Sequence, residues 1–369
     1  MRLISHGYLC RRRHKVAMIA ELNLKIQLAV PPTQSVCGMG ISMKIFVYNM
    51  REFDEKAFFD KFSVEYGVEY AYTTQSPCLE NADMAKGYDC VDIITTITDA
   101  QLIDRFKELG VKCITTRTIG FDHIDIKHAR EVGVGVTHVT YSPSSVADYT
   151  IMLILMGLRK INYIMQKADV QDFTLNGKMG KELPNCTVGV IGTGKIGRTV
   201  IKHLSGFGSK ILAYDIYPND AVKEYAQYTD LETLIKQSDV ITLHAPATDD
   251  NYHMIDKKAI GNMKDGVVII NCARGALIDT DALIEGIESR KVGFAGLDVV
   301  EHESGLYYFD RSGEPLGNAR LAILKSYSNV LVSPHTAFYT DEAVSNMVEN
   351  SIIGALRYIN NDPNKEFVC

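Results

Sequence analysis

Residues 188–197, VGVIGTGKIG, decide the fold of this chain. An apolar run, VGVI, is followed by the glycine-rich segment GTGKIG, and residues 198–207 are then typical of a helix. The glycines have G-x-G-x-x-G spacing and stand in the context that this motif requires, after a strand and at the start of a helix. A strand, a tight turn and a helix in this order predict one unit of a parallel α/β sheet.

The same glycines predict a dinucleotide site. Gly192 permits the tight turn, Gly194 lets the backbone approach a pyrophosphate, and Gly197 allows the helix to pack closely on the strand. Asp215 ends the run KILAYD, 18 positions after Gly197. An acid at this place accepts hydrogen bonds from the ribose hydroxyls of NAD and repels a 2′-phosphate. We therefore expect NAD as the cofactor; the alternative for Asp215 is a solvated acid at the end of a strand.

Short β-rich runs alternate with helical stretches on both sides of this motif. After Met43, strands are predicted at residues 44–48, 68–72, 91–97 and 111–115, with helices at 55–66 and 100–109. From residue 187 onward, the predicted strands are 187–191, 210–214, 240–244, 267–271, 292–297 and 329–332. A long helix is predicted at 144–166 and a last one at 342–359. This order predicts an α/β fold with two doubly wound parallel sheets.

Length and composition restrict the class of protein. The chain has 369 residues, enough for two domains at roughly 100–200 residues each. Its net charge of −6 argues against nucleic-acid binding through phosphate neutralisation and against attachment to an anionic membrane by charge. No apolar run approaches the roughly 20 residues that cross a bilayer. The eight cysteines are dispersed without C-x-x-C spacing, which predicts no metal site and a reducing, cytoplasmic compartment.

Residues 1–42 differ from the rest of the chain in charge. They hold six basic residues and one acidic residue, so the remaining 327 residues carry a net charge of −11. The apolar run in this segment is too short for a secretory signal. Residues 22–28 alternate with period two, whereas a transit helix needs a 3.6-residue stripe. We expect a poorly ordered leader, or the product of an upstream start codon, before a domain that opens at Met43.

Three further segments place polar residues directly after apolar strands: VIINCARGAL at 268–277, GFAGLDVVEHE at 293–303 and VLVSPHTAFY at 330–339. Because open α/β sheets bind ligands at the carboxyl ends of their strands, we expect Arg274, Glu303 and His335 to converge. A histidine can protonate a carbonyl, a neighbouring carboxylate stabilises the imidazolium, and a guanidinium holds a carboxylate through two hydrogen bonds. These residue types suit hydride transfer to a 2-oxo acid.

Each of these three residues also has a structural interpretation when it is taken alone. Arg274 could cap a helix or pair with Asp279, Glu303 could be a loop acid, and His335 could be a satisfied structural histidine. The hypothesis of a catalytic site therefore depends on the three residues acting together.

Taken jointly, four motifs carry a resemblance to a known family. They are GTGKIG at 192–197 with its following acid, NCARG at 271–275, LDVVEHE at 297–303 and SPHTAFYT at 333–340. The chain from Met43 to near its C-terminus resembles the D-isomer-specific 2-hydroxyacid dehydrogenases. Within that family it is most similar to the D-lactate dehydrogenase branch, which includes the vancomycin-resistance enzymes.

The resemblance implies a role for each catalytic candidate. His335 would be the acid/base, Glu303 its carboxylate partner and Arg274 the substrate-binding arginine. The family glutamate lies five residues after the Asp of its motif, which selects Glu303 over Glu301. The backbone N–H groups of Ile119 and Gly120 would hold the substrate carboxylate.

Further residues would line the substrate and the coenzyme. Tyr141 and Phe338 would contact the substrate, and Phe62 is a further aromatic candidate that could equally be packing. Asp298 would contact the nicotinamide carboxamide. The expected coenzyme-binding residues are Gly192, Gly194, Lys195, Ile196, Gly197, Asp215, His244, Ala245, Pro246, Cys272, Ala273 and Asp298.

The family fold implies a domain inserted into another domain. A flavodoxin-like substrate domain would comprise residues 43–141 and 337–369, and a Rossmann coenzyme domain residues 142–336, with the substrate bound between them. A homodimer is implied, with the helix after Ser144 as a candidate interface. The expected reaction is NADH-dependent, reversible reduction of pyruvate to D-lactate. The alternatives are a bulkier 2-oxo acid, giving 2-hydroxyisocaproate or phenyllactate, and an NAD-responsive binding module of the corepressor type.

Overall fold

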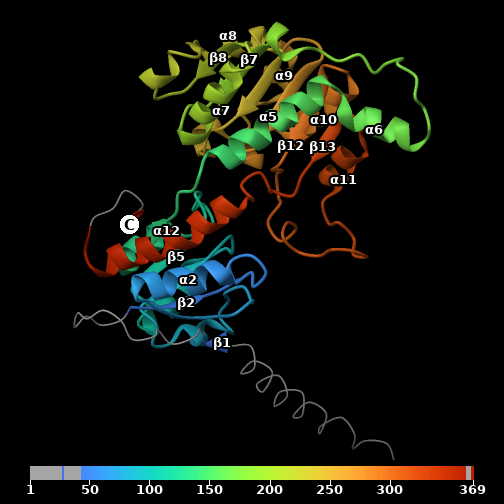
Figure 1. Ribbon diagram of the computed structural model, residues 1–369. Coiled ribbons are helices and arrows are strands. Elements are labelled where there is room, and N and C mark those ends of the chain that lie inside the picture. The colour runs from blue at the N-terminus through green and yellow to red at the C-terminus, as the bar shows by residue number, and fades with distance from the viewer. Residues whose placement is uncertain (1–26, 29–42, 363–366) are drawn as a thin grey trace, which may run out of the picture. The chain divides into compact units, whose positions relative to one another are not determined.

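The computed structural model describes residues 27–28, 43–362 and 367–369. The chain divides into two compact units, of which unit 2 is the continuous segment Pro143–Tyr339. Unit 1 combines the chain before Pro143 with Thr340–Cys369 (Figure 1). The expectation of a poorly ordered leader falls on residues 1–42, which lie outside the described residues except for Gln27–Leu28.

Unit 1 is built on a six-stranded sheet. Its strands are β1 (Gln27–Leu28), β2 (Lys44–Val47), β3 (Glu69–Tyr72), β4 (Cys90–Ile93), β5 (Cys113–Thr116) and β6 (Gly135–His138), in the order β1-β3-β2-β4-β5-β6. Only β1 is antiparallel to its neighbour, and the five others have the flavodoxin-like order. Strands β1 and β6 were not predicted from the sequence.

Helices cover both faces of this sheet. The helices are α2 (Lys56–Tyr66), α3 (Ala100–Glu108), α4 (Ile126–Val132) and α12 (Asp341–Ile359). Residues of α2 and α12 share one buried cluster, and those of α3 and α4 share another. Phe62 is 3% exposed within the first cluster and stacks on Phe58 at 6.5 Å, which supports the packing interpretation of this residue.

Unit 2 contains a seven-stranded parallel sheet. Its strands are β7 (Thr187–Ile191), β8 (Lys210–Tyr214), β9 (Gln227–Tyr228), β10 (Val240–Leu243), β11 (Val267–Asn271), β12 (Val292–Leu297) and β13 (Val330–Val332). The order β13-β12-β11-β10-β7-β8-β9 reverses at β7, as in a Rossmann fold. The prediction of two doubly wound parallel sheets is therefore confirmed.

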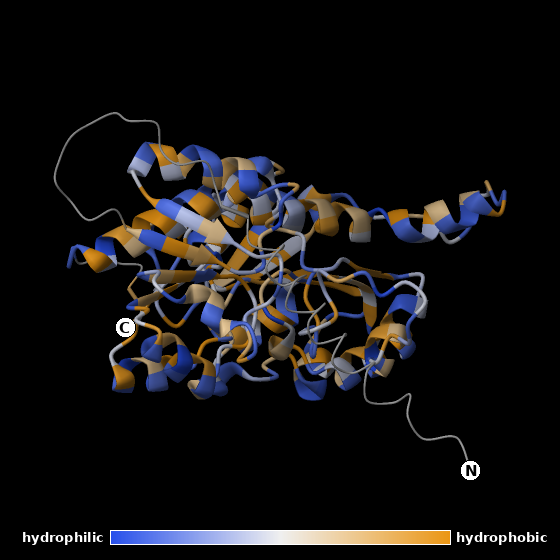
Figure 2. Cartoon of the chain, turned by 90° about the horizontal axis from the view of Figure 1, so that it is seen from below, coloured by the Kyte–Doolittle hydropathy of each residue, from blue (hydrophilic) through white to orange (hydrophobic). Residues whose placement is uncertain are grey.

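Unit 2 has seven α-helices, and all of them except the helix at Ile161–Asp169 bury apolar residues. The seven helices are α5 (Ser144–Leu158), α6 (Ile161–Asp169), α7 (Lys195–Ser205), α8 (Leu231–Gln237), α9 (Lys257–Asn262), α10 (Thr280–Glu288) and α11 (Ala319–Ser326). Figure 2 shows helices that are hydrophobic along part of their surface and strands that are largely hydrophobic. Among the helices that the structure describes, none combines the length and apolar character needed to cross a membrane.

The prediction of a single helix at residues 144–166 was wrong. The chain forms α5 and α6 instead, and Lys160 between them has a left-handed φ of 53°. The amide of Asn162 donates to the carbonyls of Ser328 and Val330, both at 3.0 Å. The start of α6 is thereby bound to the end of the sheet, which fixes the change of direction.

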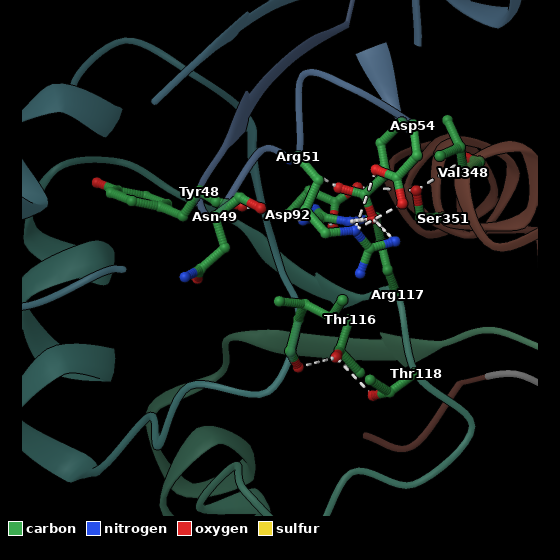
Figure 3. A network of polar contacts seen from close by, with 12 residues as sticks. Tyr48, Asn49, Arg51, Asp54, Asp92, Thr116, Arg117, Thr118, Val348 and Ser351 are labelled. Atoms are coloured by element: carbon green, nitrogen blue, oxygen red, sulfur yellow. Dashed lines mark hydrogen bonds and ion pairs between the residues drawn. The ribbon is translucent and has the colours of Figure 1, made fainter. Parts of the chain in front are cut away.

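A buried ion-pair network lies at the carboxyl edge of the unit 1 sheet (Figure 3). The guanidinium of Arg117 has no solvent exposure and contacts Asp92 at 2.7 Å and Glu55 at 3.1 Å. It also donates to the carbonyl of Tyr48 at 3.0 Å. Ser351 of α12 donates to the second oxygen of Asp92 at 2.8 Å. The network thus joins three strand ends to the C-terminal helix.

Candidate active site

His335 and Glu303 form a hydrogen-bonded pair in unit 2. They lie beyond the carboxyl ends of β13 and β12, which are neighbours in the sheet. Nδ1 of His335 is 2.6 Å from Oε1 of Glu303, and the other carboxylate oxygen accepts the N–H of Val300 at 3.0 Å. The carboxylate occupies Nδ1, so Nε2 is the ring nitrogen left to exchange a proton.

The two glutamates of the LDVVEHE segment have different partners. Glu301 lies 2.7 Å from Nε2 of His253, and its other oxygen accepts from the N–H and the hydroxyl of Thr280. Burial acts to raise the pKa of Glu301, but the hydrogen bonds from His253 and Thr280 lower it. Glu303 is therefore the acid that pairs with His335.

Asp298 holds the turn that carries His335. One carboxylate oxygen accepts from the hydroxyl of Ser333 at 2.7 Å and from the N–H of Thr336 at 2.9 Å, and the other accepts the N–H of Ala337 at 2.9 Å. The side chain of Asp298 is 1% exposed. Asp298 is also the residue that the family resemblance places at the nicotinamide carboxamide, and these bonds within the chain could not be foreseen from its motif.

Arg274 is brought next to the segment that leads to Glu303. A Cβ on the following residue, Gly275, would lie 2.2 Å from the carbonyl carbon of Val300, so only glycine allows this contact between the two backbones. Nη1 of Arg274 donates to the carbonyl of Ala273 at 2.9 Å. The role of Gly275 was missed, and its signal in the sequence was a glycine directly after the candidate arginine.

The candidate carboxylate-binding loop lies in unit 1, directly after β5. Thr118 donates to the carbonyl of Gly120 at 2.6 Å, and the hydroxyls of Thr116 and Thr118 are 2.8 Å apart (Figure 3). Ile119 and Gly120 are partly exposed, as is Tyr141 in the segment after β6. The hydroxyl chain gives this loop a defined shape.

The glycine loop has the geometry of a dinucleotide site. Gly192 has a φ of 92°, and a Cβ there would lie 2.6 Å from the carbonyl carbon of His244. A Cβ on Gly197 would lie 1.9 Å from the carbonyl oxygen of Gly192, so the helix must approach the strand without a side chain. Gly194 meets nothing within 4 Å. The backbone at Gly194 is therefore open on this side, as the motif requires if a pyrophosphate is to approach it.

Asp215 is fixed against this loop. One carboxylate oxygen accepts the N–H of Thr193 at 2.5 Å and its hydroxyl at 2.9 Å, and the other accepts the N–H of Tyr217 at 2.8 Å. Tyr228 donates to the hydroxyl of Thr193 at 2.8 Å. Sequence reasoning found Asp215 but missed Thr193 and Tyr228, which position it.

Two side chains at neighbouring strand ends are kept uncharged. Burial lowers the pKa of His244 to about 3; its Nε2 lies 2.9 Å from the hydroxyl of Thr242, and its Nδ1 is buried without a partner. Burial also raises the pKa of the Cys272 thiol. A buried polar atom without a partner is expected where a bound group supplies it. The unpartnered Nδ1 of His244 therefore fits a site that a dinucleotide completes.

The other candidates fall near the same strand ends or on the catalytic turn. Ala245 and Pro246 follow β10, Ala273 follows β11, and Lys195 and Ile196 open α7. Phe338 is 8% exposed and packs edge-on against Tyr339 with ring centres 5.8 Å apart.

Replacing Gly194 with alanine should impair coenzyme binding without unfolding the chain. The added methyl meets no protein atom within 4 Å but occupies the expected pyrophosphate space. We expect the Kd for NADH, measured by fluorescence titration, to rise at least about tenfold. Gly261→Ala is the control, because a Cβ there also meets nothing within 4 Å. Unchanged NADH affinity in Gly194→Ala would contradict the assignment.

Comparison with known proteins identifies the family. Residues 151–337 match the model of the D-isomer specific 2-hydroxyacid dehydrogenase, NAD binding domain. The chain is 46% identical over 314 residues to an aromatic 2-oxoacid reductase of Clostridium sporogenes, covering 84% of this chain and 95% of that protein. It is 38% identical over 330 residues to a D-lactate dehydrogenase of Lactiplantibacillus plantarum, covering 88% and 96%.

A solved structure of D-2-hydroxyisocaproate dehydrogenase superposes with a TM-score of 0.81 at 34% identity, covering 88% of this chain and 99% of that one. The chain belongs to the D-isomer-specific 2-hydroxyacid dehydrogenase family, in its D-lactate dehydrogenase branch. It is accordingly an NAD-dependent oxidoreductase that acts on CH–OH donors, as the sequence analysis predicted.

Proposed function

We propose that this enzyme reduces 2-oxo acids to D-2-hydroxy acids, with His335 as the proton donor. The observation that carries the proposal is the 2.6 Å contact between Nδ1 of His335 and Glu303 on a turn that Asp298 holds in place. NADH supplies the hydride when bound. His335 gives a proton from Nε2 to the carbonyl oxygen, so reduction needs the imidazolium and oxidation of the hydroxy acid needs the neutral ring.

Other residues orient the substrate in this proposal. The Arg274 guanidinium pairs with the substrate carboxylate and polarises its carbonyl, because a planar guanidinium offers two parallel N–H donors. The N–H groups of Ile119 and Gly120 also bind a carboxylate, on the loop that Thr118 shapes. Tyr141 and Phe338 contact the substrate side chain.

In this proposal, different residues of unit 2 bind different parts of the coenzyme. Gly192, Gly194 and Gly197, with the N-terminus of α7 at Lys195 and Ile196, receive the pyrophosphate. Asp215 accepts from the ribose hydroxyls. The rest of the coenzyme site is lined by His244, Ala245, Pro246, Cys272 and Ala273. Asp298 lies next to the catalytic turn and is assigned the carboxamide contact.

A 2-oxo acid with a bulky side chain is the proposed substrate, in preference to pyruvate. The proposal is supported by the 46% identity to a protein named aromatic 2-oxoacid reductase, against 38% to one named D-lactate dehydrogenase. Pyruvate is the second candidate, because the D-lactate dehydrogenase of L. plantarum matches over 88% of this chain.

A substrate panel tests the function. We expect kcat/KM with NADH to be at least about tenfold higher for phenylpyruvate than for pyruvate, since one methylene in an apolar pocket contributes about 1–3 kcal/mol. Chiral chromatography should find the D product. A preference for pyruvate above tenfold would instead make the enzyme a D-lactate dehydrogenase, and absence of turnover with every 2-oxo acid would favour a binding module.

We also propose a cytoplasmic homodimer. The six cysteines of the described chain that are free thiols fit a reducing compartment. Within the predicted interface helix at residues 144–166, the α5 part is the poorer candidate, because nine residues of α5 are buried within unit 2. The segment from α6 onward is better suited, since Phe173, Leu175 and Met179 are 76%, 87% and 86% exposed. Sedimentation of Phe173→Glu should show a larger monomer fraction than the wild type.

A further inference from the structure

Tyr308 contacts the backbone of His335. Its hydroxyl donates to the carbonyl oxygen of His335 at 2.9 Å, and the two ring centres lie 6.3 Å apart at 40°. Tyr308 is 47% exposed, so burial of its ring does not account for its position. Its φ of 70° is left-handed, which is unfavourable for a bulky side chain.

His335 is itself held in a left-handed conformation, with a φ of 53°. Its N–H donates to the carbonyl of Asp298 at 2.8 Å, and its Nδ1 is bound to Glu303 at 2.6 Å. Residues in such conformations persist where the surroundings fix them, and they concentrate at functional sites. The hydroxyl of Tyr308 supplies the bond on the remaining backbone polar group, the carbonyl.

We propose that Tyr308 is a positioning residue for the acid/base His335; this inference rests on the proposed function. With the N–H, the carbonyl and Nδ1 all bound, the imidazole keeps one orientation relative to the backbone. Nε2 then presents its proton in a constant direction. Loss of the Tyr308 hydroxyl leaves the carbonyl untethered, which should slow proton transfer and leave coenzyme binding unchanged.

The neighbouring Tyr307 provides a matched control. Its hydroxyl is buried and has no hydrogen-bond partner among the described residues. Burial, together with the charges of Glu303 and Asp298, raises the pKa of this phenol. Tyr307→Phe removes the same phenol hydroxyl from the adjacent residue. Because this hydroxyl makes no hydrogen bond, its removal breaks none and leaves the contacts of His335 unchanged.

The experiment compares Tyr308→Phe and Tyr307→Phe in the full-length enzyme. We expect Tyr308→Phe to lower kcat for the best 2-oxo acid about fivefold, the effect of one net hydrogen bond. The KM for NADH and the melting temperature should stay at wild-type values, and the solvent deuterium isotope effect on kcat should increase. Tyr307→Phe should keep kcat within about twofold of the wild type.

Two results would overturn the inference while the proposed function stands. One is a wild-type kcat and isotope effect in Tyr308→Phe; the other is an equal loss of kcat in both variants. Wild-type turnover that disappears in His335→Ala establishes the function independently in the same series. If the wild type reduces no 2-oxo acid, the proposed function fails and the role of Tyr308 fails with it.

Discussion

Replacing His335 with alanine is expected to lower kcat for 2-oxo acid reduction by about 10³-fold, because a positioned acid contributes about 10²–10⁴-fold to such a step. The NADH affinity should remain at the wild-type value, since the glycine loop and Asp215 are untouched. Stopped-flow measurement of NADH oxidation would give the rate, and fluorescence titration the affinity.

Variants of the two nearby glutamates test which carboxylate supports His335. Glu303→Gln replaces the carboxylate that binds Nδ1 of His335 and should lower kcat about tenfold or more. Glu301→Gln should keep most of the activity, because Glu301 contacts His253 and Thr280. His128→Ala is the control for loss of a histidine, since His128 pairs with Asp104 at the surface of unit 1. Wild-type kcat in His335→Ala, or an equal loss in both glutamine variants, would contradict the assignment.

Replacing Arg117 with methionine is expected to lower the free energy of unfolding by about 3–5 kcal/mol, because it leaves the buried carboxylate of Asp92 without its cation and leaves Glu55 paired with Arg51 alone, at 3.0 Å. Glu55 and Asp92 have no exposed side-chain surface. Lys112→Met is the matched control, since its ion pair with Asp89 is solvent-exposed and should contribute no more than about 1 kcal/mol. Urea unfolding followed by circular dichroism measures both.

The loss in Arg117→Met should depend on pH. Burial raises the pKa of Asp92 to about 6, and the charge of Arg117 opposes this rise. A carboxyl whose pKa is higher in the folded state stabilises the fold when protonated, and this contribution is lost as the pH rises through the folded pKa. Without Arg117, the pKa of Asp92 should rise further. The destabilisation should therefore be larger at pH 8 than at pH 5, and equal losses at both would contradict the coupling.

Much of the fold could be predicted because its signals are local. The glycine motif and each apolar strand run span only a few consecutive residues, and both sheets could be predicted from them. The misses were elements with weak local patterns: β9 has two residues, and β6 begins at Gly135 shortly after Gly133. The break at Lys160 depends on contacts of Asn162 with residues 166 and 168 positions away.

The catalytic candidates of the site could be predicted from the sequence, but the residues that support them could not. The residue types indicated His335 and Arg274 as catalytic candidates, together with two acids, Glu301 and Glu303. Only the family resemblance selected Glu303 as the partner of His335. The supporting residues gave no such signal. Arg117 meets its partners across 62 and 25 positions, and Tyr308 meets His335 across 27, so no periodicity or motif reports them.

The return of α12 to unit 1 has a consequence for synthesis on the ribosome. Ser351 and Asp92 are 259 positions apart, so the bond between them waits for almost the whole chain to emerge. Unit 2 is one continuous segment and is complete before α12 leaves the exit tunnel. Domains generally fold as units during translation. We therefore expect the order of maturation to reverse the order of the chain: the later-synthesised unit 2 folds first, and the earlier-synthesised unit 1 closes last.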